Sequence, residues 1–207
     1  ITDHAPAPDG YDPFNRMPME LYSQYLKLIS LARKNNDFSV GTGIEADFYE
    51  RGIDFLKKWL PEQPFDLVLG SVHYIKDWAF DNPSEKHIWD QVDVEIAWKS
   101  YFEEIGKLAE SGIFDVISHL DLPKKFGYKP SEKALFEMAS PVMDKIAESG
   151  MAIEINTSGL RRPIKEIYPS MQLLCMAKER NIPIVFGSDA HTPKDVGFCF
   201  KEAVQLA

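Results

Sequence analysis

The sequence is poor in cysteine, has no excess of basic residues and contains no long apolar run, and each absence excludes a class of protein. Its 207 residues include only Cys175 and Cys199, with no CxxC spacing, so neither a disulfide framework nor a thiolate zinc site is indicated. The net charge of −9 argues against nucleic-acid binding, which needs a basic surface. No apolar run approaches the roughly 20 residues that span a bilayer, and no signal segment opens the chain. We therefore expect a soluble, cytoplasmic protein that binds neither nucleic acid nor membranes, and its oligomeric state stays open.

Short apolar runs rich in β-branched residues alternate along the chain with longer stretches of helical periodicity. The predicted strands are residues 39–44, 65–72, 113–118, 151–155 and 182–187. The predicted helices are residues 18–34, 48–60, 91–110, 131–149, 165–180 and 194–206. This alternation predicts an α/β fold with parallel strands and helices outside, in a single domain over residues 1–207.

Histidines and acids recur where the predicted strands end. The residues are His4, Glu45, His73, His119, Asp189 and His191. A lone histidine at a strand end is more often structural than a ligand, but here the pattern repeats across the units. In parallel barrels the chemistry lies at the carboxyl ends of the strands. The pattern therefore predicts a multinuclear metal site, and imidazole with carboxylate ligands suits zinc, manganese or iron.

Six segments resemble, in order, the motifs of the polymerase and histidinol phosphatase (PHP) superfamily. They are ITDHAP, GIEADF, GSVHYIKDWAFDNP, SHLDLPKKFG, EINTSGLRRP and GSDAHTPKDVG. The third and fourth look most like those of the monofunctional histidinol-phosphate phosphatases. The resemblance implies a distorted (β/α)7 TIM-like barrel with up to three divalent metals at its mouth, acting on phosphate monoesters.

The resemblance also implies a role for each ligand. Glu45 would bridge two metals, His73 and His119 would complete the second, Asp189 would bind the first, and His4 with His191 would hold the third. The HxH pair with which the family opens is absent, and ITDH reads as the end of a strand. We therefore expect that the first strand is missing from an N-terminally incomplete sequence; the alternative is a barrel with a defective first site.

The expected chemistry is attack on phosphorus by a hydroxide that bridges two metals. Metals neutralise the phosphate dianion and lower the pKa of bound water from 15.7 toward ~7. Glu45, Asp189 and His191 are the predicted catalytic residues, and the expected proton donor to the leaving oxygen is His191 or a metal-bound water beside it.

The substrate is expected to be a small phosphate monoester. Arg161 or Arg162 in SGLRRP would bind the phosphate, and we expect only one of the two to contact it. Asp47 and Trp78 are the predicted contacts for a cationic part of the substrate. Lys124 and Lys125 are interpreted as solvated side chains.

Three functions remain open from the sequence. The favoured one is a metal-dependent histidinol-phosphate phosphatase of histidine biosynthesis. A PHP phosphoesterase or exonuclease that acts on nucleotides or nucleic acid would use the same metals. A non-catalytic metal-binding barrel is the third possibility if the HxH strand is truly absent.

Overall fold

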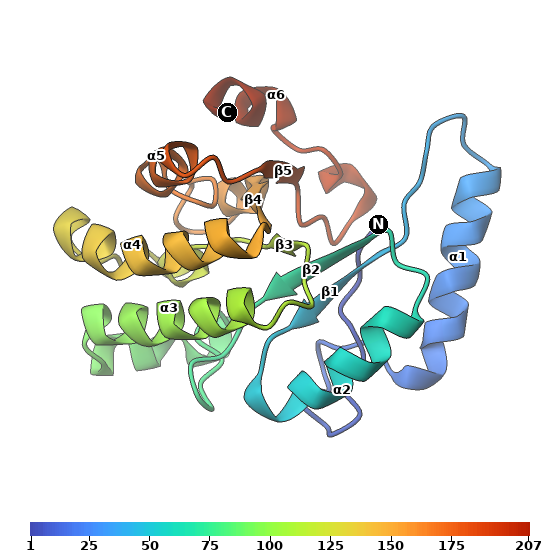
Figure 1. Ribbon diagram of the computed structural model, residues 1–207, viewed down its shortest axis with the longest axis horizontal. Helices are drawn as coiled ribbons and strands as arrows, with labels where there is room; N and C mark the ends of the chain where they lie inside the picture. The colour runs from blue at the N-terminus through green and yellow to red at the C-terminus, as the bar shows by residue number, and fades with distance from the viewer.

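Five short apolar segments form parallel strands in a single sheet with the order β1-β2-β3-β4-β5, as a computed structural model of residues 1–207 shows (Figure 1). The strands are β1 (Gly43–Asp47), β2 (Leu67–Ser71), β3 (Val116–Ile117), β4 (Ala152–Asn156) and β5 (Ile184–Gly187). Each strand pairs with the next along the chain, so the connections between them cross over in one direction.

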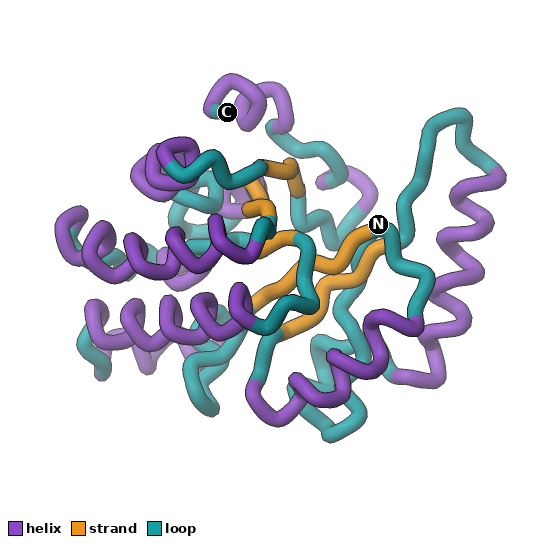
Figure 2. The backbone as a smooth tube through the Cα atoms, viewed as in Figure 1, coloured by secondary structure: helices purple, strands orange, loops and turns teal.

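Helices lie around the outside of this sheet (Figure 2). They are α1 (Tyr22–Lys34), α2 (Ile53–Trp59), α3 (Val94–Glu110), α4 (Glu132–Ser149), α5 (Met171–Glu179) and α6 (Phe200–Leu206). The side chains of Asp93 and Ser131 cap the first turns of α3 and α4 by accepting hydrogen bonds from backbone N–H groups. Gly150 ends α4 in the left-handed conformation that favours glycine. None of the helices combines the length and apolarity needed to cross a membrane.

The first residues of the chain add a strand-like edge beside β1. The N–H groups of Gly43 and Glu45 donate to the carbonyls of Ile1 and Asp3, both at 2.8 Å, and His4 forms a parallel bridge with Glu45. His4 on this edge and His191 beyond β5 have ring centroids 6.3 Å apart. In a flat sheet of six strands these edges would lie about 24 Å apart. The sheet is therefore strongly curled, as in a barrel, although its hydrogen bonding does not close.

The first strand begins four residues later than the sequence pattern predicts. Residues 39–42 form a loop because the Thr42 N–H donates to the Asp66 carboxylate at 2.7 Å and Arg33 donates to the Val40 carbonyl at 2.6 Å. Glu45 and Asp47 consequently lie within β1, where alternation places both side chains on the same face of the sheet.

The predicted helix at 165–180 is shortened to α5. Its first six residues form a loop that Tyr168 anchors to Asn156 through two backbone hydrogen bonds, of 2.6 and 2.9 Å. Tyr168 is thereby buried at the edge of the cavity described next.

Candidate metal centre

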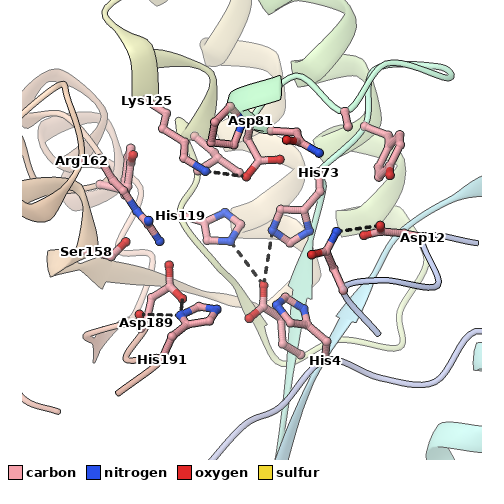
Figure 3. Close-up of a pocket in the computed structure, with 18 of the residues that line it drawn as sticks. His4, Asp12, His73, Asp81, His119, Lys125, Ser158, Arg162, Asp189 and His191 are labelled. Carbon is pink, nitrogen blue, oxygen red and sulfur yellow. Dashed lines mark hydrogen bonds and ion pairs between the residues drawn. The ribbon is translucent and has the colours of Figure 1, made fainter. Parts of the chain in front are cut away.

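All six residues predicted as metal ligands line one cavity of about 220 Å³ at the carboxyl end of the sheet (Figure 3). His73, His119 and Asp189 each follow the last residue of a strand by two positions. His4 lies on the edge segment, Glu45 lies inside β1, and His191 follows Asp189. Convergence of strand ends thus brings together side chains that are up to 187 positions apart in the sequence.

Glu45 lies at the centre of a group with His73 and His119. Its Oε1 is 3.3 Å from Nε2 of His119 and 3.7 Å from Nε2 of His73. One ligand atom from each of these residues lies within 4.8 Å of the others. Bonds of about 2.0–2.2 Å in a tetrahedral site put neighbouring ligand atoms roughly 3.3–3.6 Å apart. The three side chains therefore fit a divalent transition metal with little rearrangement.

His73 is held in the tautomer that a metal requires. Its Nδ1 lies 2.8 Å from Oδ1 of Asp47, which as a carboxylate can only accept a hydrogen bond. The proton is therefore on Nδ1, and in the neutral ring the lone pair of Nε2 points toward Glu45. Such carboxylate–histidine pairs fix ring orientation at metal sites and increase the basicity of the ligand.

Hydrogen-bond donors from four residues surround the buried carboxylate of Asp47. Besides His73, it accepts hydrogen bonds from Ser71 Oγ at 2.6 Å, from the Tyr11 hydroxyl at 3.2 Å and from the guanidinium of Arg16. Its side chain is only 1% exposed. The sequence suggested a substrate contact for Asp47, whereas the structure places it behind His73, where it does not line the cavity.

Burial and neighbouring charges shift the pKa values of these groups in opposite directions. Burial raises the pKa of Asp47, but the charges of His73 and Arg16 outweigh it and hold the pKa well below its usual range. Burial raises the pKa of Glu45 too, but hydrogen bonding to His119 and the nearby histidine charges bring it well below normal. Burial lowers the pKa of His73, yet Asp47 raises it to about 9. Without a metal, a second proton on His73 therefore balances the charge of Asp47 at neutral pH.

Glu154 is a buried acid that the sequence analysis missed. It accepts hydrogen bonds from the backbone N–H of His119 at 3.1 Å and from Nδ2 of Asn156 at 2.8 Å. Burial raises its pKa to about 7, against the lowering effect of His119. A charged residue inside the apolar run AIEIN was the available signal. Gly187 makes room for it, because a Cβ there would lie 1.6 Å from Oε1 of Glu154.

The second part of the centre contains His4, Asp189 and His191. His4 forms a further candidate group with Glu45 and Asp47, again with ligand atoms within 4.8 Å of one another. Its Nδ1 lies 3.3 Å from Nη1 of Arg16. Nδ1 of His191 lies 3.3 Å from Oδ1 of Asp189, and the His191 side chain is 63% exposed.

The residues suggested for substrate binding separate into two groups. Arg162 lines the cavity and extends toward it from one side (Figure 3), whereas Arg161 does not line it. Trp78 does not line it either, and packs on Trp89 with ring centroids 4.7 Å apart.

The interpretation of Lys124 and Lys125 as solvated is wrong. Lys124 is 1% exposed because its ammonium donates to the Ile167 carbonyl at 2.7 Å and pairs with Asp121 at 2.9 Å. Lys125 lines the cavity and pairs with Asp81 at 2.9 Å.

Comparison with known proteins agrees with this geometry. The family model described as PHP domain matches residues 1–158, and a second, described as PHP-associated, matches residues 174–203. The chain belongs to the PHP family. A Deinococcus radiodurans protein described as a probable histidinol-phosphatase is 40% identical over 207 residues, covering 99% of this chain and 78% of that protein. These matches confirm the membership of the PHP family that the sequence motifs indicated.

Two crystal structures share the fold. One, from Listeria monocytogenes, superposes with a TM-score of 0.82 at 22% identity, covering 98% of this chain and 86% of the other. The other is a histidinol phosphate phosphatase from Lactococcus lactis in complex with zinc, L-histidinol and phosphate. Its TM-score is 0.73 at 19% identity, with 93% and 76% of the two chains covered. The predicted PHP-type α/β fold is confirmed.

Proposed function

We propose that this chain is a metal-dependent histidinol-phosphate phosphatase, which hydrolyses L-histidinol phosphate to L-histidinol and phosphate. The observation that carries the proposal is the convergence of Glu45, His73 and His119 on one point, with Asp47 fixing the ring of His73. The relatives' description as histidinol-phosphatases supports the substrate. The net charge of −9 and two free cysteines favour a small substrate and a cytoplasmic location for a single PHP-type domain.

The cavity is proposed to hold two or three divalent metals. Glu45, His73 and His119 would bind one ion, and His4, Asp189 and His191 would bind the others, with Glu45 shared. The neutral imidazole and carboxylate donors suit zinc, manganese and iron alike, and the zinc in the Lactococcus lactis structure favours zinc. Bound metals would neutralise the phosphate dianion and supply the nucleophile from water at neutral pH.

The chain's own residues would orient the substrate and lie beside the proton donor. Arg162 lies at the cavity wall and can donate two parallel hydrogen bonds to phosphoryl oxygens. Because an imidazole nitrogen that binds a metal cannot also donate a proton, the proposed proton donor to the leaving oxygen is a water beside His191, whose side chain is 63% exposed at the open side of the cavity.

The test compares substrates and variants of the metal-loaded protein. L-Histidinol phosphate should be hydrolysed with a higher kcat/KM than an aryl phosphate, a sugar phosphate or a nucleotide. Equal rates across the panel would contradict the histidinol assignment but not the phosphatase assignment. Glu45→Gln should lose both activity and tightly bound metal; retention of both would overturn the metal centre itself.

Arg162→Ala tests phosphate binding separately. Removing a charged hydrogen-bond donor should lower kcat/KM by about 10- to 150-fold, equivalent to roughly 1.5–3 kcal/mol, with the metal content unchanged. Arg180→Ala is a matched control, because Arg180 pairs with Asp144 at 2.7 Å and does not line the cavity. Parent-like kinetics for Arg162→Ala would show that phosphate is held by other groups.

A further inference from the structure

Arg161 makes its hydrogen bonds with the backbone of the loop that carries Asp189. Its Nη2 donates to the carbonyl of Ser188 at 2.6 Å and to the carbonyl of Asp189 at 2.9 Å. Arg161 ends the turn after β4, and these carbonyls follow β5. One guanidinium therefore joins two neighbouring loops at the mouth of the cavity.

The backbone that Arg161 holds is in an unusual conformation. Asp189 has a φ of 44°, in the left-handed region that residues other than glycine adopt in only a small minority of cases, aspartate more often than most. Strain of this kind persists only where surrounding contacts enforce it. The carbonyls of Ser188 and Asp189 lie on the two sides of the Asp189 Cα, so Arg161 holds both peptide groups that flank this residue and stabilises its conformation directly.

Arg161 is itself fixed in place. Its guanidinium lies 5.2 Å from the ring centroid of Phe198, and its Nε is 3.9 Å from Asp195. Both partners belong to the segment that follows His191. The side chain is 19% exposed, and its Nη1 is buried without a partner. The arginine thus contacts the loop before and after the proposed ligands Asp189 and His191.

We propose that Arg161 is a positioning residue, which holds the carboxylate of Asp189 in the conformation that binds metal. The proposal rests on the proposed metal role of Asp189. Under this proposal the two adjacent arginines have different roles. Arg162 faces the cavity, and Arg161 holds the loop that carries Asp189.

If Arg161 acts through its charge, removing it should change metal affinity in one direction; if it acts by positioning Asp189, removing it should change the affinity in the other. If its positive charge were the main influence, loss of the charge would reduce repulsion of a nearby cation and strengthen metal binding. If it positions Asp189, its loss should weaken binding, by about 10- to 100-fold as for other residues that orient metal ligands. Arg161→Lys separates the two effects further, because it keeps the charge but not the planar guanidinium.

The experiment titrates chelator-stripped protein with Zn²⁺ and measures stoichiometry and affinity for the parent, Arg161→Ala, Arg161→Lys, Asp189→Asn and the double variant Arg161→Ala/Asp189→Asn. We expect both Arg161 variants to lower the affinity for the same Zn²⁺ ion whose affinity Asp189→Asn lowers. In the double variant, Arg161→Ala should add nothing, because its effect passes through Asp189. Thermal unfolding of each metal-free variant shows whether it is folded.

Arg180→Ala is again the matched control, because Arg180 is also 19% exposed and bonds Ser140 Oγ at 3.0 Å far from the cavity. It should lose some thermal stability and keep the parent's Zn²⁺ affinity. The inference would be overturned if Arg161→Ala bound Zn²⁺ as tightly as the parent, or more tightly. It would also be overturned if Arg161→Ala reduced Zn²⁺ affinity in the Asp189→Asn background by as much as it does in the parent. Parent-like Zn²⁺ binding by Asp189→Asn would instead overturn the proposed metal role of Asp189.

Discussion

Replacement of Asp47 by Asn should destabilise the metal-free protein far more than the same change at Asp66. Both aspartates pair with an arginine, but the Arg16–Asp47 side chains are 4% and 1% exposed, and the Arg33–Asp66 side chains are 46% and 59% exposed. Removing one partner of a buried pair leaves an uncompensated charge and costs about 3–5 kcal/mol. An exposed pair is worth about 0–1 kcal/mol.

The pH dependence of this difference follows from two pKa shifts. The lowered pKa of Asp47 gives stability that is present above roughly pH 4 and is lost as the pH falls further. The pKa of His73, raised to about 9 by Asp47, gives stability that is complete below roughly pH 6.5 and is lost as the pH rises through 9. The gap between parent and Asp47→Asn should therefore be largest from about pH 4 to 6.5. It should narrow above pH 9 but persist, because Arg16 stays charged.

Urea unfolding of the chelator-treated proteins at pH 5.5, 7 and 9.5 measures this gap. A loss of about 3–5 kcal/mol corresponds to roughly 6–20 °C in Tm for a chain of this size. If Asp47→Asn and Asp66→Asn prove equally mild, or if the gap does not depend on pH, the account of Asp47 as a buried charge bound by Arg16 and His73 is wrong.

Three further outcomes are expected. Zn²⁺ binding at pH 7 should release about one proton from His73, whose pKa is raised to about 9; a binding enthalpy that is the same in buffers of different ionisation enthalpy would contradict this. Gly187→Ala should cost about 1–3 kcal/mol by overpacking, since its Cβ would lie 1.6 Å from Glu154, while Gly41→Ala, with its nearest neighbour at 3.6 Å, should stay close to the parent in urea unfolding. Trp78→Ala should lower Tm and leave KM unchanged, because Trp78 does not line the cavity; a raised KM would show a substrate contact.

The convergence of the proposed metal ligands on one cavity could be predicted from the sequence, because their positions depend on a simple rule of parallel sheets. His73, His119 and Asp189 each stand two residues beyond a strand, and the carboxyl ends of parallel strands meet on one side of the sheet. The predicted limits of β1 were wrong by a few residues, but this error did not change the predicted site, because Glu45 still lines the cavity at the carboxyl end of the sheet. The fold class followed from the same alternation of strand and helix.

The residues that surround the ligands could not be predicted in the same way. Glu45 and Asp47 occupy equivalent alternate positions, and nothing local shows that one is open to the cavity and the other buried. The difference comes from Arg16, 31 positions away, which the loop between His4 and α1 carries onto Asp47. This contact depends on the path of the long irregular segment between His4 and α1. A segment without helical or strand periodicity gives no sequence signal for its path.

The different surroundings of Arg161 and Arg162 follow from local geometry that the sequence does not show. Arg161 is the last residue of a 3₁₀ turn, Thr157–Arg161, and Arg162 is extended. A 3₁₀ helix has three residues per turn, so successive side chains point about 120° apart. The turn ends between the two arginines, so their side chains leave the backbone in different directions, and the sequence SGLRRP is compatible with either one facing the cavity. Only the direction in which the turn ends decides that Arg162 faces the cavity and Arg161 reaches the carbonyls of Ser188 and Asp189. We therefore expect a one-residue insertion in this turn to move both guanidinium groups, so the proposed phosphate contact of Arg162 and the proposed support of Asp189 by Arg161 would be lost together.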